Sequence, residues 1–172
     1  MTGSVNMPID EWSLTFVGDE LGADEAHVWR ASLDQPADMI ASLAPLLSQD
    51  EYRRAERFHR PIDRRRFIAG RGILRKIISA YLALAPDEVR FAYNKYGKPS
   101  ISDDQNRGAL SFNLSHSNSM ALYAVARGRR VVVIMAHSRQ HGFCCCFSSF
   151  RAAAPGVSRP ASTWEFRHGP IC

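Results

Sequence analysis

The pattern of apolar and polar positions predicts a long helix in the middle of the chain. Over residues 63–84, apolar residues and one glycine recur every three or four positions, as on the buried face of a helix. These positions are Phe67, Gly70, Leu74, Ile77, Ile78, Tyr81 and Leu82. Arg64, Arg71 and Arg75 fall outside this pattern. We therefore expect a core helix that ends at Pro86, with these arginines away from its apolar face.

Two shorter helices are expected before the long one. The first covers residues 38–47. Ser48 and Glu51 have the spacing of a capping box, in which each side chain accepts a hydrogen bond from the other residue's backbone N–H. We expect a second helix to start there and to continue to Phe58, before Pro61 interrupts it.

The rest of the ordered pattern is that of strands joined by short turns. Residues 26–34 alternate between two faces and end before Pro36, which indicates a strand. Gly97 and Pro99 mark a turn that leads to a short extended piece, and Gly128 begins another turn. Further strands are expected over residues 88–94, 108–117, 120–127 and 130–135. A long core helix on an antiparallel sheet gives an α/β fold of the α+β kind.

The character of the sequence changes near residue 137. From there on, neither helical nor strand periodicity is sustained, and Ser, Arg, Pro, Gly and Cys dominate. We expect an N-terminal extension over residues 1–25, one folded unit over residues 26–136 and an irregular tail over residues 137–172.

All four cysteines lie in this tail, three of them adjacent at positions 144, 145 and 146 and the fourth at position 172. Adjacent cysteines do not satisfy disulfide geometry without strain, so no disulfide framework is expected among them. His137 and His141 have a spacing that two metal ligands on a helix would have. No second ligand cluster follows them, so we do not expect a zinc site.

The positive charge is concentrated late in the chain. The formal net charge is +5, to which residues 105–172 contribute +7, from eight arginines and Glu165, and residues 1–104 contribute −2. A basic excess fits a phosphate-bearing ligand, a nucleic acid or an ordinary solvated surface. We do not expect nucleic acid as a partner, because acidic residues dilute the arginine-rich stretch and no nucleic-acid motif accompanies it. Its arginines are Arg53, Arg54, Arg57, Arg64, Arg65 and Arg66.

The sequence predicts neither a membrane span nor a secretory signal. The longest apolar runs, such as residues 131–136, have five or six residues, whereas a membrane helix needs about 20. The first residues lack a basic segment followed by an apolar one. We expect a cytoplasmic protein with no membrane partner.

Residues 112–117, FNLSHS, raise the question of chemistry. Ser115 with His116 would be a nucleophile and its base, a pair of side chains that bind phosphate, or the polar end of an ordinary strand. Adjacent residues of a strand point to opposite faces of the sheet, which argues against the first alternative. A histidine with a purely structural role remains the main competitor to phosphate binding.

Three motifs in order carry a resemblance to a known family. They are FHRPIDRRRFIAGRGILRKII, YNKYGKPSI and FNLSHS. Together they resemble the N-terminal half of Sfp-type 4'-phosphopantetheinyl transferases over residues 29–130. The resemblance implies transfer of the phosphopantetheine arm of coenzyme A to a serine of an acyl or peptidyl carrier protein, with release of 3',5'-ADP and with magnesium at the pyrophosphate. It also implies one lobe of a two-lobed, pseudo-twofold fold and the start of the second lobe.

The resemblance also implies which residues bind the coenzyme. Arg54 and Arg71 match contacts around the 3'-phosphate, and Lys98 matches the turn beside the nucleotide. Ser115 and His116 match residues against the phosphates, with His116 as a hydrogen-bond donor. The residue types suit the ligand, because arginine binds phosphate through a bidentate fork and lysine as a compact charge. We assign no catalytic residue and no metal ligand.

The chain departs from the family pattern where the metal carboxylates are expected. Val133 or Ile134 stands in place of the aspartate of Gly-x-Asp-x-Glu, and Met135 or Ala136 in place of the glutamate. Magnesium requires oxygen ligands that these side chains do not provide. A disrupted reading frame near residues 131–137 and a short family member with a diverged metal site are competing accounts.

Two further expectations follow from the missing carboxylates and the missing second lobe. The activity of this chain is doubtful, so a non-catalytic protein that binds coenzyme A or a carrier protein is the alternative function. An isolated lobe would expose apolar surface, which favours self-association.

Overall fold

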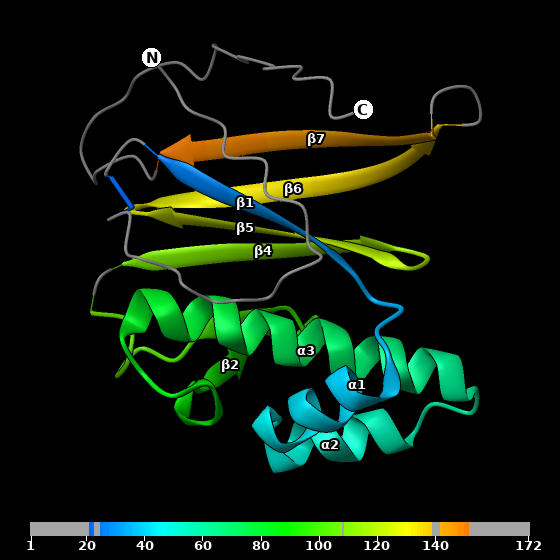
Figure 1. Cartoon of the computed structure of the whole chain (residues 1–172). Coiled ribbons are helices and arrows are strands. Elements are labelled where there is room, and N and C mark those ends of the chain that lie inside the picture. The colour runs from blue at the N-terminus through cyan, green and yellow to red at the C-terminus, as the bar shows by residue number, and fades with distance from the viewer. Residues whose placement is uncertain (1–20, 23–24, 108, 139–141, 152–172) are drawn as a thin grey trace.

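The computed structural model of the chain describes residues 21–22, 25–107, 109–138 and 142–151. Its helices and strands, named as in Figure 1, are β1 (Ala26–Ser32), α1 (Ala37–Leu43), η1 (Ala44–Leu46), α2 (Gln49–Glu56), α3 (Pro61–Leu82), η2 (Pro86–Glu88), β2 (Phe91–Tyr93), β3 (Pro99–Ile101), β4 (Leu110–Ser117), β5 (Met120–Arg127), β6 (Arg129–Ser138) and β7 (Gly142–Arg151).

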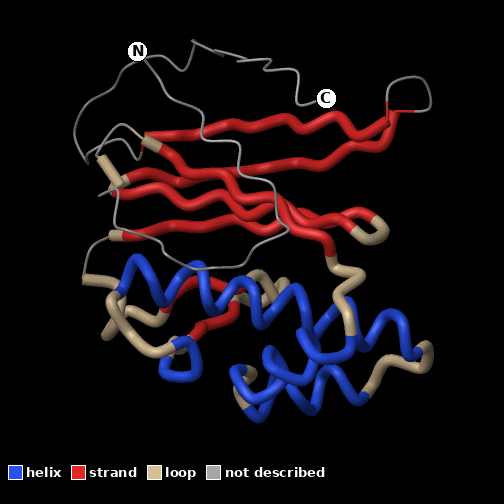
Figure 2. Tube along the Cα trace, in the orientation of Figure 1, coloured by secondary structure: helices blue, strands red, loops and turns tan. Residues whose placement is uncertain are grey.

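These elements are stacked in layers. The sheet of β1, β5 and β4 has α3 against one face and the β6–β7 pair over the other, and α1 and α2 lie beyond α3 (Figure 1). Figure 2 shows helices and strands on separate sides of the molecule, except for the short β2–β3 hairpin among the helices. The predicted α+β fold, a long core helix on an antiparallel sheet, is confirmed.

Strand β5 lies at the centre of the sheet and pairs antiparallel with both β1 and β4. Its residues alternate between two cores. Tyr123 and Val125 pack in the core that contains α3, whereas Leu122 and Ala124 pack with Val131 of β6 on the other face. Burial on both faces explains why β5 is an almost continuous apolar run rather than an apolar and polar alternation.

Helix α3 has the predicted apolar face, but it is buried on other sides as well. It starts at Pro61, a favourable first helical residue, and ends at Ala83 in a left-handed conformation (φ 53°), before Pro86 begins η2. Arg71 and Arg75, which lie outside the predicted apolar face, are nevertheless buried, at only 7% and 1% exposed. The helices and the β2–β3 hairpin cover the side of α3 that the sheet leaves open.

Two glycines of α3 provide a matched test of this packing. A Cβ atom at Gly72 would lie 2.7 Å from Cβ of Leu43 in α1, whereas one at Gly70 would have Cδ2 of Leu33 as its nearest neighbour, at 3.6 Å. Gly72→Ala is expected to lower the free energy of unfolding by about 1–3 kcal/mol through overpacking. Gly70→Ala is expected to raise it by about 0.5–1 kcal/mol, because alanine favours a helix. Denaturant unfolding measures both, and equal effects would contradict the close packing of α1 on α3.

Strand β6 is not a fourth strand of the central sheet. It pairs with β7 in a separate two-stranded sheet and lies along β4, held by side chains of that strand. The hydroxyl of Ser111 donates a hydrogen bond to the carbonyl of Arg129, and Oδ1 of Asn113 accepts one from N–H of Val133 at 2.9 Å. Because alternate residues of β4 face the same side, they form a polar row along β6.

The prediction of an irregular tail is wrong for Gly142–Arg151, which form β7. The strand is antiparallel to β6, from Arg129 opposite Arg151 to Ser138 opposite Gly142. Its sequence lacks the sustained apolar and polar alternation from which a strand is predicted. His137 and Ser138 belong to β6, whereas residues 139–141 and 152–172, with His141 and Cys172, and the first 20 residues lie outside the described residues.

In the parts of the chain that the structure describes, no helix combines the length and the apolar character needed to cross a bilayer.

Candidate functional site

Arg71 lies at the centre of a cluster formed by α2, α3 and β2. Its guanidinium carbon is 5.6 Å from the ring centroid of Phe67 and 5.7 Å from that of Tyr93. Its Nε is 4.0 Å from Oε1 of Glu51. Among the described residues, its buried Nη1 has no hydrogen-bond partner. A buried guanidinium that keeps an unused donor is suited to bind an anion.

The second arginine of the cluster, Arg75, has hydrogen-bond partners at both Nε and Nη1. Its Nε donates to Oε2 of Glu51 at 2.7 Å, and its Nη1 donates to the carbonyls of Pro86 and Val89 at 3.1 and 2.8 Å. The same Oε2 accepts a hydrogen bond from N–H of Ser48 at 3.0 Å, which confirms the predicted capping box. Glu51 and Arg75 therefore join α2 and α3 to η2 and to the residue that follows it.

The charges of this cluster do not balance. Glu51 is 3% exposed and faces two buried arginines, and it makes its short contact with Arg75 rather than with Arg71. Arginine stays protonated in proteins, so two guanidinium groups and one carboxylate leave a net positive charge. A buried unbalanced charge is costly, and an anion at Arg71 would reduce that cost.

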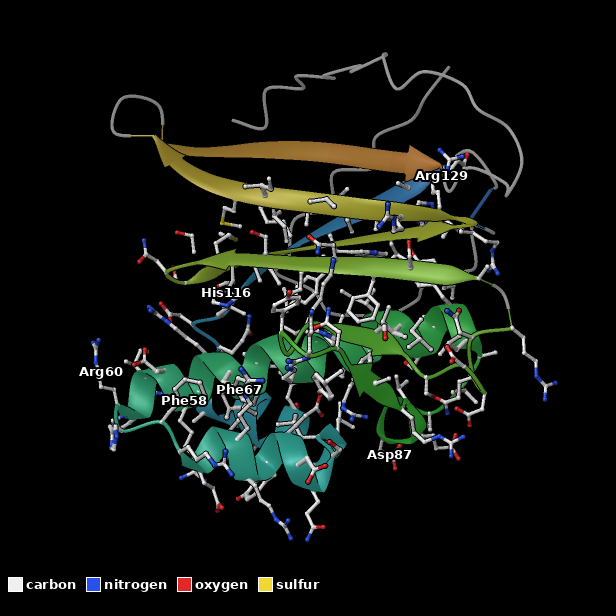
Figure 3. The ribbon with its side chains drawn as sticks, turned by 180° about the vertical axis from the view of Figure 1, so that it is seen from behind. Phe58, Arg60, Phe67, Asp87, His116 and Arg129 are labelled. Carbon is white, nitrogen blue, oxygen red and sulfur yellow. The ribbon has the colours of Figure 1, made fainter. Side chains whose placement is uncertain are left out.

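Arg54 lies beside this cluster on α2. Its guanidinium carbon is 5.7 Å from the ring centroid of Phe67, so Arg54 and Arg71 contact the same ring. Figure 3 shows Phe67 next to Phe58, and their ring centroids are 5.3 Å apart. Arg54 is exposed whereas Arg71 is buried. The two predicted residues are thus brought together, one at the surface and one below it.

Tyr93 of β2 contacts this cluster at Arg71 and Glu51, while Phe91 of the same strand lies 5.4 Å from the guanidinium carbon of Arg75. The Tyr93 hydroxyl donates to Oε1 of Glu51 at 3.4 Å, the oxygen that also faces Arg71. Burial raises the pKa of Tyr93, an effect that the nearby Arg71 guanidinium partly opposes. The phenol therefore stays protonated at neutral pH and acts as a donor to the carboxylate.

Lys98 lies in the turn that follows Tyr93. Oδ1 of Asn94 accepts hydrogen bonds from N–H of Tyr96 and N–H of Lys98, at 2.9 and 3.0 Å. Gly97 has a φ of 75°, a conformation that favours glycine. The turn is thus fixed by its own sequence, and Lys98 is exposed on it, with no described contact to Arg54 or Arg71.

Ser115 and His116 lie on opposite faces of β4. Oγ of Ser115 accepts a hydrogen bond from N–H of Met135 at 3.1 Å, on the face covered by β6. His116 is opposite Ala121, which packs on the α3 side, and its side chain is exposed. Figure 3 shows His116 on the helix-facing side of the sheet, toward the half of α3 that carries Phe67. A nucleophile and base pair is therefore excluded by this geometry.

A family model described as 4'-phosphopantetheinyl transferase, N-terminal, matches residues 28–127, which is more than half of the chain. The chain belongs to the 4'-phosphopantetheinyl transferase family. Every residue of the Arg71 cluster lies within the match.

Several curated phosphopantetheinyl transferases are similar to this chain. 4'-Phosphopantetheinyl transferase HetI of Nostoc sp. is 47% identical over 117 residues, which are 68% of this chain and 49% of that protein. Phosphopantetheinyl transferase of Thraustochytrium sp. is 33% identical over 70% of this chain and 42% of its own length. 4'-Phosphopantetheinyl transferase Sfp of Bacillus subtilis is 31% identical over 45% of this chain and 34% of its own length. The chain spans about half the length, or less, of these relatives.

The magnesium site that the phosphopantetheinyl transferase resemblance implies does not fit the residues present. The described side chains at the expected positions, Val133, Ile134 and Met135, have no oxygen atoms, and no acidic residue occurs between Asp104 and Glu165. In the described part of the chain, no group of three or more His, Cys, Asp or Glu residues is arranged to hold a metal. These residues therefore do not form a site for a hard cation.

Sequence reasoning missed the neighbours of Arg71. Phe67 was assigned to the apolar core, Glu51 to a helix cap, and Tyr93 to an ordinary strand. For Glu51 a sequence signal existed. Glu51 is the third residue of α2 and lies on the same helix face as Ala55, four residues later, and both are buried. No sequence signal indicated Tyr93, since its contact with Arg71 depends on how the β2–β3 hairpin packs on α3.

Proposed function

We propose that this chain holds coenzyme A for the transfer of its phosphopantetheine arm to a serine of an acyl or peptidyl carrier protein. One observation carries the proposal: a buried, net positive cluster in which Nη1 of Arg71 has no partner among the described residues. The 3'-phosphate of coenzyme A supplies the complementary anion. Membership of the phosphopantetheinyl transferase family supports the same ligand.

Each predicted residue has a role in this proposal. Arg71 binds the 3'-phosphate from below, through its guanidinium fork, and Arg54 binds it from the surface. Lys98 adds a mobile positive charge from the turn after Tyr93. His116 donates from its exposed ring to a phosphate oxygen. The hydroxyl of Ser115 is engaged by β6, so it supports the strand and the backbone beside His116.

The proposed reaction is a phosphoryl-type group transfer. The hydroxyl oxygen of the carrier serine forms a bond to the β-phosphorus of coenzyme A, and the serine proton passes to water. The bond from that phosphorus to the bridging oxygen breaks, and 3',5'-ADP leaves with the oxygen and the electron pair. The residues of this chain bind and orient the coenzyme, and no step is assigned to a metal.

A transfer assay tests this function directly. The chain is incubated with coenzyme A, magnesium and an apo carrier protein, and the intact mass of the carrier is measured. We expect the carrier to gain one phosphopantetheine arm and 3',5'-ADP to appear in equal amount. Calorimetric titration with coenzyme A in parallel separates binding from transfer.

The other outcomes of this experiment are informative. Binding of coenzyme A without transfer would contradict the catalytic part of the proposal and leave a coenzyme-binding protein. Absence of coenzyme binding, together with salt-sensitive binding to nucleic acid, would contradict the proposal as a whole.

A further inference from the structure

Arg71 is held by two aromatic rings that come from different elements. Phe67 is one helical turn before Arg71 on α3, whereas Tyr93 belongs to β2. The two distances, 5.6 and 5.7 Å, are nearly the same. Tyr93 is 44% exposed, while Arg71 is 7% exposed. The Tyr93 ring therefore forms part of the cover over a guanidinium that would otherwise face water.

Neither of the other contacts orients Arg71 firmly. Oε1 of Glu51 is 4.0 Å from Nε of Arg71, and the same carboxylate is bound at 2.7 Å by Arg75. Phe67 is shared with Arg54, whose guanidinium carbon is 5.7 Å from that ring. A long side chain without a firm contact loses rotamer freedom when it binds a ligand, which weakens binding.

We propose that Tyr93 is a positioning residue, whose ring holds the Arg71 guanidinium in place for the 3'-phosphate of the coenzyme. The inference rests on the proposed function, since it concerns the phosphate assigned to Arg71. The ring does this work by stacking on the guanidinium and keeping water from it. The hydroxyl is secondary, because its 3.4 Å contact is with Glu51 and not with Arg71.

The test compares two ligands that differ only in the 3'-phosphate, coenzyme A and 3'-dephospho-coenzyme A. Calorimetry on the full chain measures both affinities for the unsubstituted protein, Tyr93→Leu and Tyr93→Phe. Tyr93→Leu is expected to bind coenzyme A roughly fivefold to tenfold more weakly, the effect of losing a desolvated cation–π contact. Its affinity for dephospho-coenzyme A is expected to stay unchanged. Tyr93→Phe retains the ring and is expected to behave like the unsubstituted chain toward both ligands.

A purely structural role gives a different pattern. If Tyr93→Leu lowers the affinity for both ligands by the same factor, Tyr93 does not act through Arg71 and the inference is overturned. If Tyr93→Phe loses as much affinity for coenzyme A as Tyr93→Leu, the hydroxyl and not the ring is responsible. That result also overturns the inference. Tyr93→Thr, a β-branched residue suited to a strand, provides the same comparison if the leucine variant does not fold.

Failure of the proposed function has its own signature. An unsubstituted chain that binds neither ligand contradicts the coenzyme site itself. An unsubstituted chain that prefers coenzyme A to the dephospho form, with that preference intact in Tyr93→Leu, contradicts only the role of Tyr93.

Discussion

Replacement of Arg75 by alanine is expected to lower the free energy of unfolding by about 3–5 kcal/mol, the usual cost of removing one partner of a buried ion pair. The substitution leaves Glu51 without its 2.7 Å contact at a site that is 3% exposed. It also leaves the carbonyls of Pro86 and Val89 without the donor that they share. α2, α3 and the segment of η2 and Val89 lose a common attachment, so the whole α3 layer is affected.

Chemical denaturation monitored by circular dichroism measures this loss. Arg65→Ala is the matched control, because Arg65 is an exposed arginine of the same helix. The control is expected to leave the free energy of unfolding nearly unchanged. A loss in Arg75→Ala no larger than that of the control would show that the buried pair does not stabilise the fold.

Replacement of Arg71 by alanine is expected to have the opposite profile: a large effect on binding and a small one on stability. Coenzyme A affinity is expected to fall roughly 100-fold, because two charge-assisted hydrogen bonds to phosphate are lost. The fold is expected to tolerate the change, since Glu51 keeps its contact with Arg75 and the alanine removes a buried charge with an unused donor. The coenzyme A affinity of Arg71→Lys is expected to lie between those of Arg71→Ala and the unsubstituted chain, because lysine retains the charge but lacks the planar fork of the guanidinium.

Calorimetric titration with coenzyme A and thermal unfolding of the same samples check both halves of this prediction. Arg53→Ala is the control for net charge, because Arg53 is an exposed arginine of α2 that precedes Arg54. If Arg71→Ala and Arg53→Ala weakened binding equally, the effect would be one of general surface charge and the specific site would be wrong.

The sequence was sufficient to predict a long core helix on an antiparallel sheet, because local signals determine these elements. The capping box at Ser48, the apolar period of α3 and the polar turn at Gly97 all occur where they were expected. The two buried arginines could not be predicted in this way. Their burial depends on Glu51 and on carbonyls from η2 and the residue after it, which are distant in sequence and meet only when α2, α3 and β2 pack together.

In the candidate site too, some features could be predicted from the sequence and others depend on how the elements pack. Arg54 and Arg71 were predicted from motifs, and the structure places both on the Phe67 ring. Opposite orientations of Ser115 and His116 followed from strand geometry alone and are confirmed. Tyr93 was not predicted, because a strand residue that contacts a helix arginine leaves no periodic trace. Strand β7 was missed because the sequence of Gly142–Arg151 has no sustained strand periodicity.

The hydrogen bonds from β4 hold β6 through its backbone, in addition to the inward packing of Val131 and Val133. Asn113 and Ser115 accept from the backbone N–H groups of Val133 and Met135, groups that every residue except proline possesses. Residues on the outward face of such a strand, where Ile134 is 56% exposed, can be replaced without loss of these contacts. Acidic residues there could be gained or lost in evolution without moving the strand, so the scaffold and the chemistry of this position can diverge separately.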